Sequence, residues 1–159
     1  MADNEDIKPP DSEPPAGRRE LSEEEKNMLR RAETVIAGMT EQYQEIAAQD
    51  VSQIEEAVAE LEGEPGGHPM ALKRIFDVAH DMKGQGETFG YPMITVIGNQ
   101  LCRFIETLSG APNADELAVI KLHAKALRVV VAERIKTSDG ETAKTLLGGL
   151  ELVIQKIRG

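Results

Sequence analysis

One short segment of this sequence combines residue types that could carry out chemistry. It covers residues 79–86 and reads Ala-His-Asp-Met-Lys-Gly-Gln-Gly. His80 and Lys83 are three positions apart, so they are neighbours on one face if the segment is helical. The ammonium group disfavours a positively charged imidazole, which keeps the ring neutral and nucleophilic. It can also neutralise the oxygens of an incoming phosphoryl group, so the pair suits phosphoryl transfer.

The apolar residues around His80 predict its place on the helix. They recur every three or four positions and form one arc: Leu72, Ile75, Phe76, Ala79 and Met82. At about 100° per residue, His80 lies roughly a quarter turn from the centre of this arc. One side of its ring can therefore be packed while the other meets solvent. A purely structural histidine would fit the same position.

Two glycines follow the histidine, at Gly84 and Gly86. Each costs about 1 kcal/mol relative to alanine inside a helix. Gly84 lies close to the face of His80, at an angular offset of about 40°. Missing side chains beside a nucleophile would allow the surface of another protein to approach. A simpler interpretation is that the glycines only mark the end of the helix, and this applies above all to Gly86.

Outside this segment the sequence predicts helices separated by short breakers. Ser22 and Glu25 form a capping box that begins the first helix. Asp50 with Gln53 could cap a second helix, so the chain either breaks or bends near Gln49. Apolar residues with helical spacing mark the expected helices, at about residues 22–49, 50–62, 70–89, 92–108, 114–136 and 141–157.

This pattern predicts an all-α fold of antiparallel helices that pack as a four-helix bundle. Its core is expected over about residues 50–136, with an extra N-terminal helix and an extra C-terminal helix. Residues 21–159 are expected to form one helical domain, and residues 1–20 a disordered, acidic and proline-rich tail. The apolar stripe from Met28 to Ile46 could wrap the bundle or pair with a second copy.

The composition excludes several classes of protein. The chain of 159 residues has 28 acidic and 18 basic residues and a net charge of −10, which disfavours nucleic acid as a partner. No stretch of 18 apolar residues predicts a membrane span, and the acidic N-terminus is unlike a secretory signal. Cys102 is the single cysteine. It is expected to be buried, and a cytoplasmic location is expected for the protein.

Residues 80–84, His-Asp-Met-Lys-Gly, resemble the His-x-x-Lys-Gly motif of histidine-containing phosphotransfer (HPt) domains. The similarity extends to the apolar helix before the histidine, a small residue at Gly86 and the closing pair Phe89-Gly90. It covers about residues 50–136 in helix order, with the sharp motif confined to residues 76–92. The resemblance implies a bacterial two-component phosphorelay protein. Such a protein accepts a phosphoryl group from a receiver domain's aspartyl phosphate and passes it to another receiver.

Carried over by position, the resemblance makes His80 the phosphoryl acceptor, through its Nε2 atom. Lys83 would neutralise the phosphoryl charge, Gly84 and Gly86 would leave room for a receiver, and Gln85 could contact phosphate. The predicted partner-binding residues are Lys73, Asp77, Gly84, Gln85 and Gly86. The implied partners are receiver domains, a hybrid histidine kinase, or both. The protein would have no ATP site and no cofactor, because Mg²⁺ belongs to the receiver, and it would not be an enzyme by itself.

Three other interpretations use the same residues. A histidine kinase dimerisation domain would need an ATP-binding domain that this length does not allow. A di-metal bundle needs two Glu-x-x-His pairs, and the sequence offers only the near miss Asp77-x-x-His80. His68 and His123 are expected at the surface and complete no such site. A helical adaptor that binds receivers without relaying phosphate stays open, as do the identity of the kinase and receivers, the direction of transfer and the oligomeric state.

Overall fold

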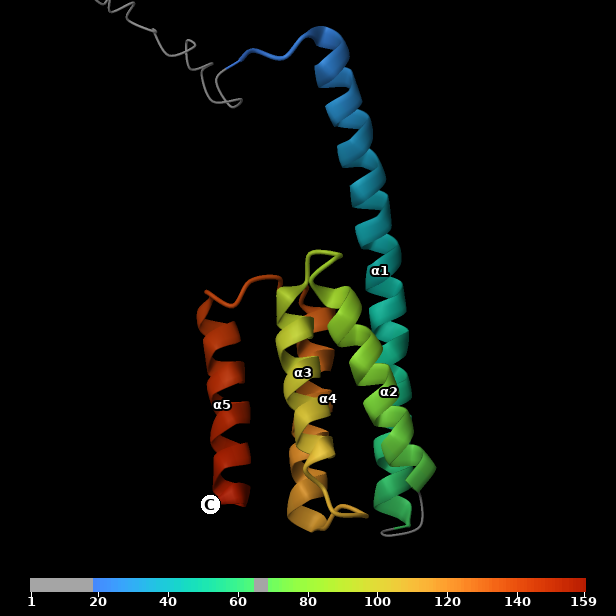
Figure 1. Ribbon diagram of the computed structural model, residues 1–159, viewed down its shortest axis with the longest axis vertical. Coiled ribbons are helices and arrows are strands. Elements are labelled where there is room, and N and C mark those ends of the chain that lie inside the picture. The colour runs from blue at the N-terminus through green and yellow to red at the C-terminus, as the bar shows by residue number, and fades with distance from the viewer. Residues whose placement is uncertain (1–18, 65–68) are drawn as a thin grey trace, which may run out of the picture. The chain divides into compact units, whose positions relative to one another are not determined.

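The computed structural model describes residues 19–64 and 69–159. These residues form five α-helices and no strand, which confirms the all-α class (Figure 1). None of the helices in this part of the chain is long and apolar enough to cross a membrane. The helices are α1 (Glu23–Gly63), α2 (Pro69–Gly86), α3 (Pro92–Glu106), α4 (Ala114–Ala132) and α5 (Glu141–Arg158). The tail predicted over residues 1–20 lies almost entirely outside the described residues.

Helix α1 begins at the predicted capping box. The Ser22 amide donates to Glu25 Oε2 at 2.8 Å, and the Glu25 amide donates to Ser22 Oγ at 3.2 Å. The chain does not break near Gln49, because α1 is one helix of 41 residues. Residues 39–62 contain neither glycine nor proline, so nothing interrupts the backbone hydrogen bonds. The expected N-terminal helix and the first helix of the expected bundle are therefore one element.

The chain divides into two compact units, Met1–Ala37 and Gly38–Gly159. In the described part of the first unit, the large apolar side chains of α1 are exposed to solvent. They are Met28, Leu29, Val35 and Ile36, with exposed fractions of 49–68%, and Leu21 just before the helix is 43% exposed. In the second unit, Met39 and Ile46 are also about half exposed. Burial along α1 begins with Tyr43 and Ala47, so the earlier part of the predicted stripe adds nothing to the core.

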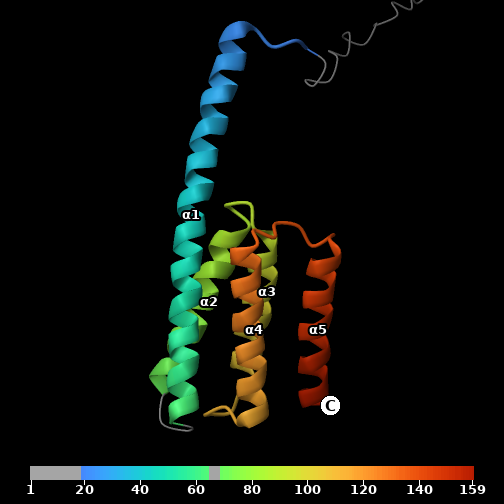
Figure 2. The ribbon, with the colours of Figure 1, turned by 180° about the vertical axis from the view of Figure 1, so that it is seen from behind.

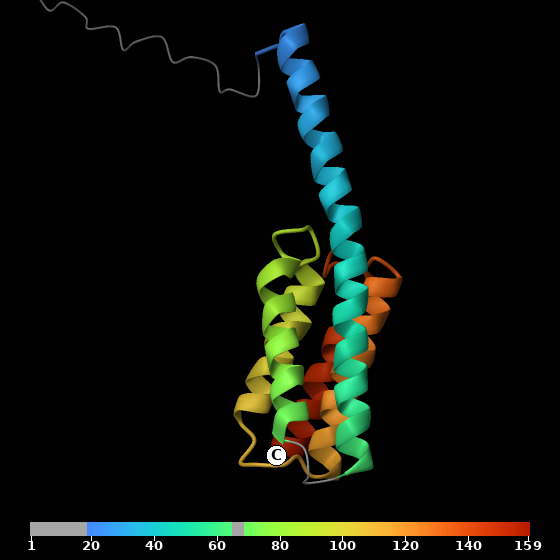
Figure 3. The ribbon, with the colours of Figure 1, turned by 90° about the vertical axis from the view of Figure 1, so that its right-hand side faces the viewer.

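The second unit holds the apolar core. Consecutive helices from α2 to α5 run in alternating directions and lie side by side (Figure 1, Figure 3). Helix α2 packs on α3, α3 packs on α4, and α5 packs on both α3 and α4 (Figure 2). The core is built from aliphatic side chains with no exposed surface: Val51, Ile54, Ile75, Ile94, Ile97, Leu101, Ile120 and Leu127. Burial of this apolar surface is the main stabilising contribution.

Ion pairs at the helix surfaces add four links between α1 and its neighbours in the second unit. Three join an arginine of α2, of α4 or of the segment after α4 to a glutamate of α1: Arg74 to Glu60 at 2.7 Å, Arg128 to Glu55 at 2.6 Å and Arg134 to Glu41 at 2.8 Å. The fourth joins Lys121 of α4 to Glu62. Exposed pairs of this kind contribute about 0–1 kcal/mol each, so they fix register more than stability.

Candidate functional site

His80 lies in the second half of α2, on the surface of the helix. Its side chain is exposed, and its ring stacks on Phe76 with centroids 6.0 Å apart and an interplanar angle of 26°. Within residues 19–64 and 69–159, neither ring nitrogen has a hydrogen-bond or ion-pair partner. The ring is thus backed by Phe76 on one side and open to a reactant on the other, as the apolar arc predicts.

Lys83 follows one turn later and is half-buried. Its backbone carbonyl accepts a hydrogen bond from Thr95 Oγ1 on α3 at 3.0 Å. No carboxylate pairs with its ammonium group in the described part of the chain. Arg74 on the same helix, by contrast, pairs with Glu60. The positive charge one turn after His80 is therefore not neutralised by a carboxylate of the described residues.

The two glycines differ sharply in their surroundings. Gly84 is exposed, and a Cβ atom built there would meet nothing within 4 Å. Gly86 is buried, and its Cβ would lie 2.8 Å from Thr95 Oγ1 and 2.9 Å from the Tyr91 carbonyl oxygen. Helix α3 fills the space beside Gly86, so that space is not available to a partner. Gly86 has a packing role, whereas Gly84 leaves the surface next to His80 open.

Helix α2 ends at Gly86, about three residues earlier than its apolar pattern suggests. The Tyr91 amide donates to the Gly86 carbonyl at 2.7 Å, and the Gly90 amide donates to the Glu87 carbonyl at 3.2 Å. Gly90 has a φ of 85°, the left-handed conformation that this type of helix ending requires. The predicted role of Gly90 at the helix end is thus confirmed, and the turn leads directly into α3.

The other predicted partner-binding residues are exposed on α2. Lys73 and Asp77 pair with each other, with Nζ and Oδ2 2.6 Å apart, and Gln85 is exposed next to Gly84. Asp81 is also exposed, and its charge acts on Asp50 of α1. Burial raises the pKa of Asp50, and the nearby Asp81 raises it further.

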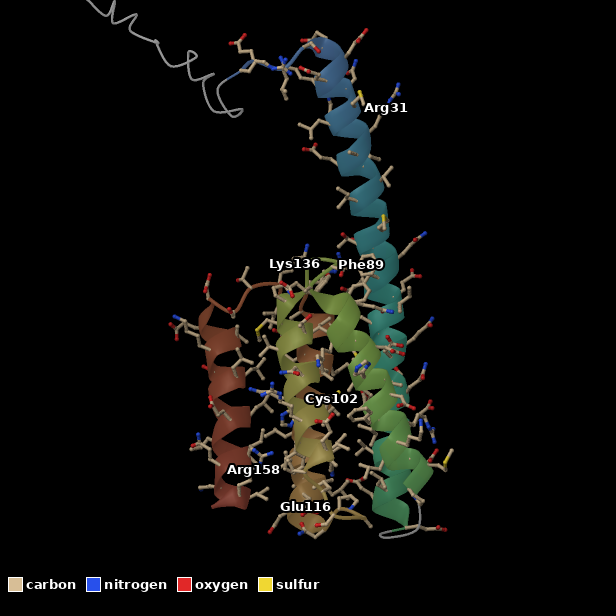
Figure 4. All side chains as sticks on the ribbon, in the orientation of Figure 1. Arg31, Phe89, Cys102, Glu116, Lys136 and Arg158 are labelled. Atoms are coloured by element: carbon tan, nitrogen blue, oxygen red, sulfur yellow. The ribbon has the colours of Figure 1, made fainter. Side chains whose placement is uncertain are left out.

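An aromatic cluster holds the turn after α2 against α1. The rings of Tyr43 and Phe89 stack with centroids 4.8 Å apart, and the Tyr91 hydroxyl donates to Gln44 Oε1 at 2.7 Å. Lys136 Nζ lies 5.5 Å from the centroid of the Tyr91 ring. Figure 4 shows Phe89 and Lys136 at the end of the helices where α2 leads into α3. The cluster fixes the end of the helix that presents His80.

His123 is buried with 0% exposure, which corrects the expected surface position. Its Nδ1–H donates to the Val119 carbonyl at 2.8 Å, and Nε2 has no partner within the described residues. Burial lowers the pKa of His123, so the ring is neutral in the folded protein. A ring enclosed in this way cannot accept a phosphoryl group from another protein. His68, the third histidine, lies outside the described residues.

Cys102 is buried, as predicted. Its thiol lies 3.8 Å from the Phe76 carbonyl oxygen, and burial raises its pKa to about 11. In the described part of the chain, no group of three or more His, Cys, Asp or Glu residues is arranged to hold a metal ion.

We expect the buried His123 to make the protein less stable as the pH falls below about 6.5, the ordinary value for histidine. The unfolded chain then binds a proton that the folded chain resists, so the free energy of unfolding drops by up to about 1.4 kcal/mol per pH unit. Urea unfolding between pH 7.5 and 5.5 measures this slope. His123→Asn should remove the contribution of this ring, and His80→Gln, the exposed control, should keep it. An equal slope in His123→Asn and the unsubstituted protein would contradict the assignment.

A groove of about 470 Å³ between α1 and α4 contains none of the predicted site residues. Its walls include Val58, Ala124 and Val129. His80 and Lys83 instead lie on the surface of α2, a position that suits contact with another protein. Comparison of the chain with protein-family models, curated proteins and solved structures gives no match.

Proposed function

We propose that this protein is a phosphorelay intermediate of the HPt type. His80 accepts a phosphoryl group from the aspartyl phosphate of a receiver domain and passes it to another receiver in bacterial two-component signalling. The observation that carries the proposal is the exposed His80 ring, with Lys83 three positions later on the same helix. Neither side chain has a hydrogen-bond or ion-pair partner among the described residues. The open surface at Gly84 supports it, because a receiver can approach there.

In this proposal the described helices form the antiparallel four-helix bundle of the HPt type plus one addition. The part of α1 after Gly38 and the helices α2, α3 and α4 make up the bundle, and α5 packs outside it. The helix order from α1 to α4 and the turn after α2 support this assignment. The added α5 buries only Ala143 and Leu150 completely, which fits a helix on the outside of a core.

The transfer step follows from the chemistry of a neutral imidazole. The Nε2 lone pair attacks phosphorus, a nitrogen–phosphorus bond forms, and the bond between phosphorus and the receiver's aspartate oxygen breaks. The bonding electrons remain on the carboxylate that leaves. Lys83 stabilises the charge on the phosphoryl oxygens during transfer. The reverse reaction delivers the group to a second receiver, and Mg²⁺ is supplied by the receiver in both directions.

Incubation with a panel of phosphorylated receiver domains tests this proposal. We expect a label that is acid-labile and base-stable, as a phosphoramidate is, and no label from ATP with the purified chain alone. Receivers that bind without leaving a label would instead support the helical adaptor. A label from ATP alone would contradict the absence of an ATP site.

Lys83→Ala should slow transfer more than it weakens binding. The ammonium group acts mainly on charge that gathers during transfer, so its loss should lower the rate within the complex by about 100-fold. Single-turnover labelling at several receiver concentrations separates the maximal rate from the half-saturating concentration. Lys144→Ala is a matched control, because Lys144 is exposed on α5, outside the predicted site. An unchanged maximal rate with weaker binding would contradict the role of Lys83.

A further inference from the structure

Helix α3 approaches the turn of α2 that carries His80 unusually closely. The contact is made at Gly98, which is buried. A Cβ built at Gly98 would lie 3.1 Å from the Ala79 carbonyl oxygen, and 3.3 Å from both the Cβ and the amide nitrogen of Lys83. A side chain at this position would force these neighbouring atoms to shift by a few tenths of an ångström. His80 lies within the turn of α2, from Ala79 to Lys83, that touches Gly98.

Thr95 makes a second contact one turn earlier on α3. Its hydroxyl donates to the Lys83 carbonyl at 3.0 Å. This carbonyl lies in the last turn of α2. The contact is reciprocal, since the missing side chain of Gly86 makes room for Thr95. The backbone of Lys83 is thus held from α3 by a hydrogen bond and by direct packing.

We infer that Gly98 and Thr95 are positioning residues for phosphoryl transfer, an inference that rests on the proposed function. Neither residue touches the phosphoryl group. Both act through Lys83: Gly98 sets where its side chain leaves α2, and Thr95 fixes its backbone. Glycine is unfavourable inside a helix, and here it allows the Lys83 stem to lie directly against α3. The start of the Lys83 side chain is then held at a constant place one turn after the exposed ring.

A double-mutant cycle between Gly98 and Lys83 tests this inference. Gly98→Ala should displace Lys83 by a few tenths of an ångström and slow transfer about tenfold, less than the 100-fold that a 1 Å displacement can cost. In a Lys83→Ala background the same change should have little further effect, because the ammonium group is already absent. Gly149→Ala is the control, since a Cβ at Gly149 has nothing within 4 Å. Thermal unfolding of each variant shows whether the fold is kept.

Thr95 provides an independent arm of the test. Thr95→Ser keeps the hydroxyl and should transfer close to the normal rate, whereas Thr95→Val keeps the shape but loses the donor and should be slower. If the role of Gly98 were merely structural, the effects of Gly98→Ala and Lys83→Ala on the transfer rate would add. The loss of rate would then also parallel the loss of stability. Additive effects, or a normal rate in Gly98→Ala, would overturn the inference and leave the proposed function intact.

A further measurement applies if no receiver labels the unsubstituted protein, in which case the proposed function fails. Lysines carrying ¹³C-dimethyl groups give separate NMR signals, and Lys83→Arg identifies the signal of Lys83. Gly98→Ala should shift this signal and Gly149→Ala should leave it in place. An unshifted Lys83 signal in Gly98→Ala would overturn the positioning of Lys83 by α3.

Discussion

Replacing His80 with glutamine should abolish the acid-labile label that phosphorylated receivers leave on this protein. Glutamine approximates the size and polarity of the ring but has no nucleophilic nitrogen, so no nitrogen–phosphorus bond can form. We expect the label to fall to the level of a protein-free blank. The fold should be unaffected, because His80 is exposed and makes no hydrogen bond in the described part of the chain.

The other two histidines serve as controls for this result. His123 is enclosed in the core, so mapping of the label to His123 would mean that the structure around it opens during transfer. His68→Gln should transfer at the normal rate. An acid-labile label that survives in His80→Gln, or one that maps to His68, would show that the acceptor is assigned to the wrong residue.

Gly84→Gln should block transfer while the protein stays folded. The surface at Gly84 is open, so a side chain there points into the space that a receiver must occupy. A separation of even about 1 Å from the in-line geometry can cost 100-fold in rate, and glutamine would hold the surfaces further apart. The free energy of unfolding should stay the same or rise slightly, because glutamine has less backbone entropy to lose than glycine.

Gly86→Ala gives the contrasting result and completes the experiment. Its Cβ would overlap Thr95 and the backbone of Tyr91, so we expect a loss of stability of about 1–3 kcal/mol. Thermal unfolding and receiver-dependent labelling of both variants separate a docking surface from a packing contact. Normal transfer by Gly84→Gln would mean that the receiver approaches His80 from another side.

Much of the helical layout follows from the spacing of apolar residues and from breakers such as Gly90 with Pro92. The continuity of α1 could not be predicted in this way, since Asp50 and Gln53 also have the spacing of a helix start. A capping residue such as Asp50 favours a new helix start, which competes with continuation of the existing helix. Here the buried residues Val51, Ile54 and Val58 keep the same face of α1 directed inward. Tertiary contacts decide between one continuous helix and a new helix start at Asp50. A short stretch of sequence does not contain these contacts.

The exposed part of the candidate site could be predicted, because His80, Lys83 and Gly84 lie within one turn and a half of a single helix. The roles of Gly86 and Gly98 could not, since they depend on how α2 and α3 align. A glycine in the middle of an apolar helix, as at Gly98, is the signal that points to such a close contact. His123 was placed wrongly because two lysines flank it. Its spacing from Ile120 and Leu127 matches the buried face, and this was the better guide.

The single cysteine provides a built-in measure of motion beneath the site. Cys102 lies in the contact between α3 and the α2 backbone at Phe76, the residue that supports the His80 ring. With its pKa raised to about 11 and its sulfur buried, the thiol reacts only when this contact opens. The rate of thiol labelling in the native protein therefore reports how often α2 and α3 separate. No engineered cysteine is needed, and the rate can be followed as a receiver binds.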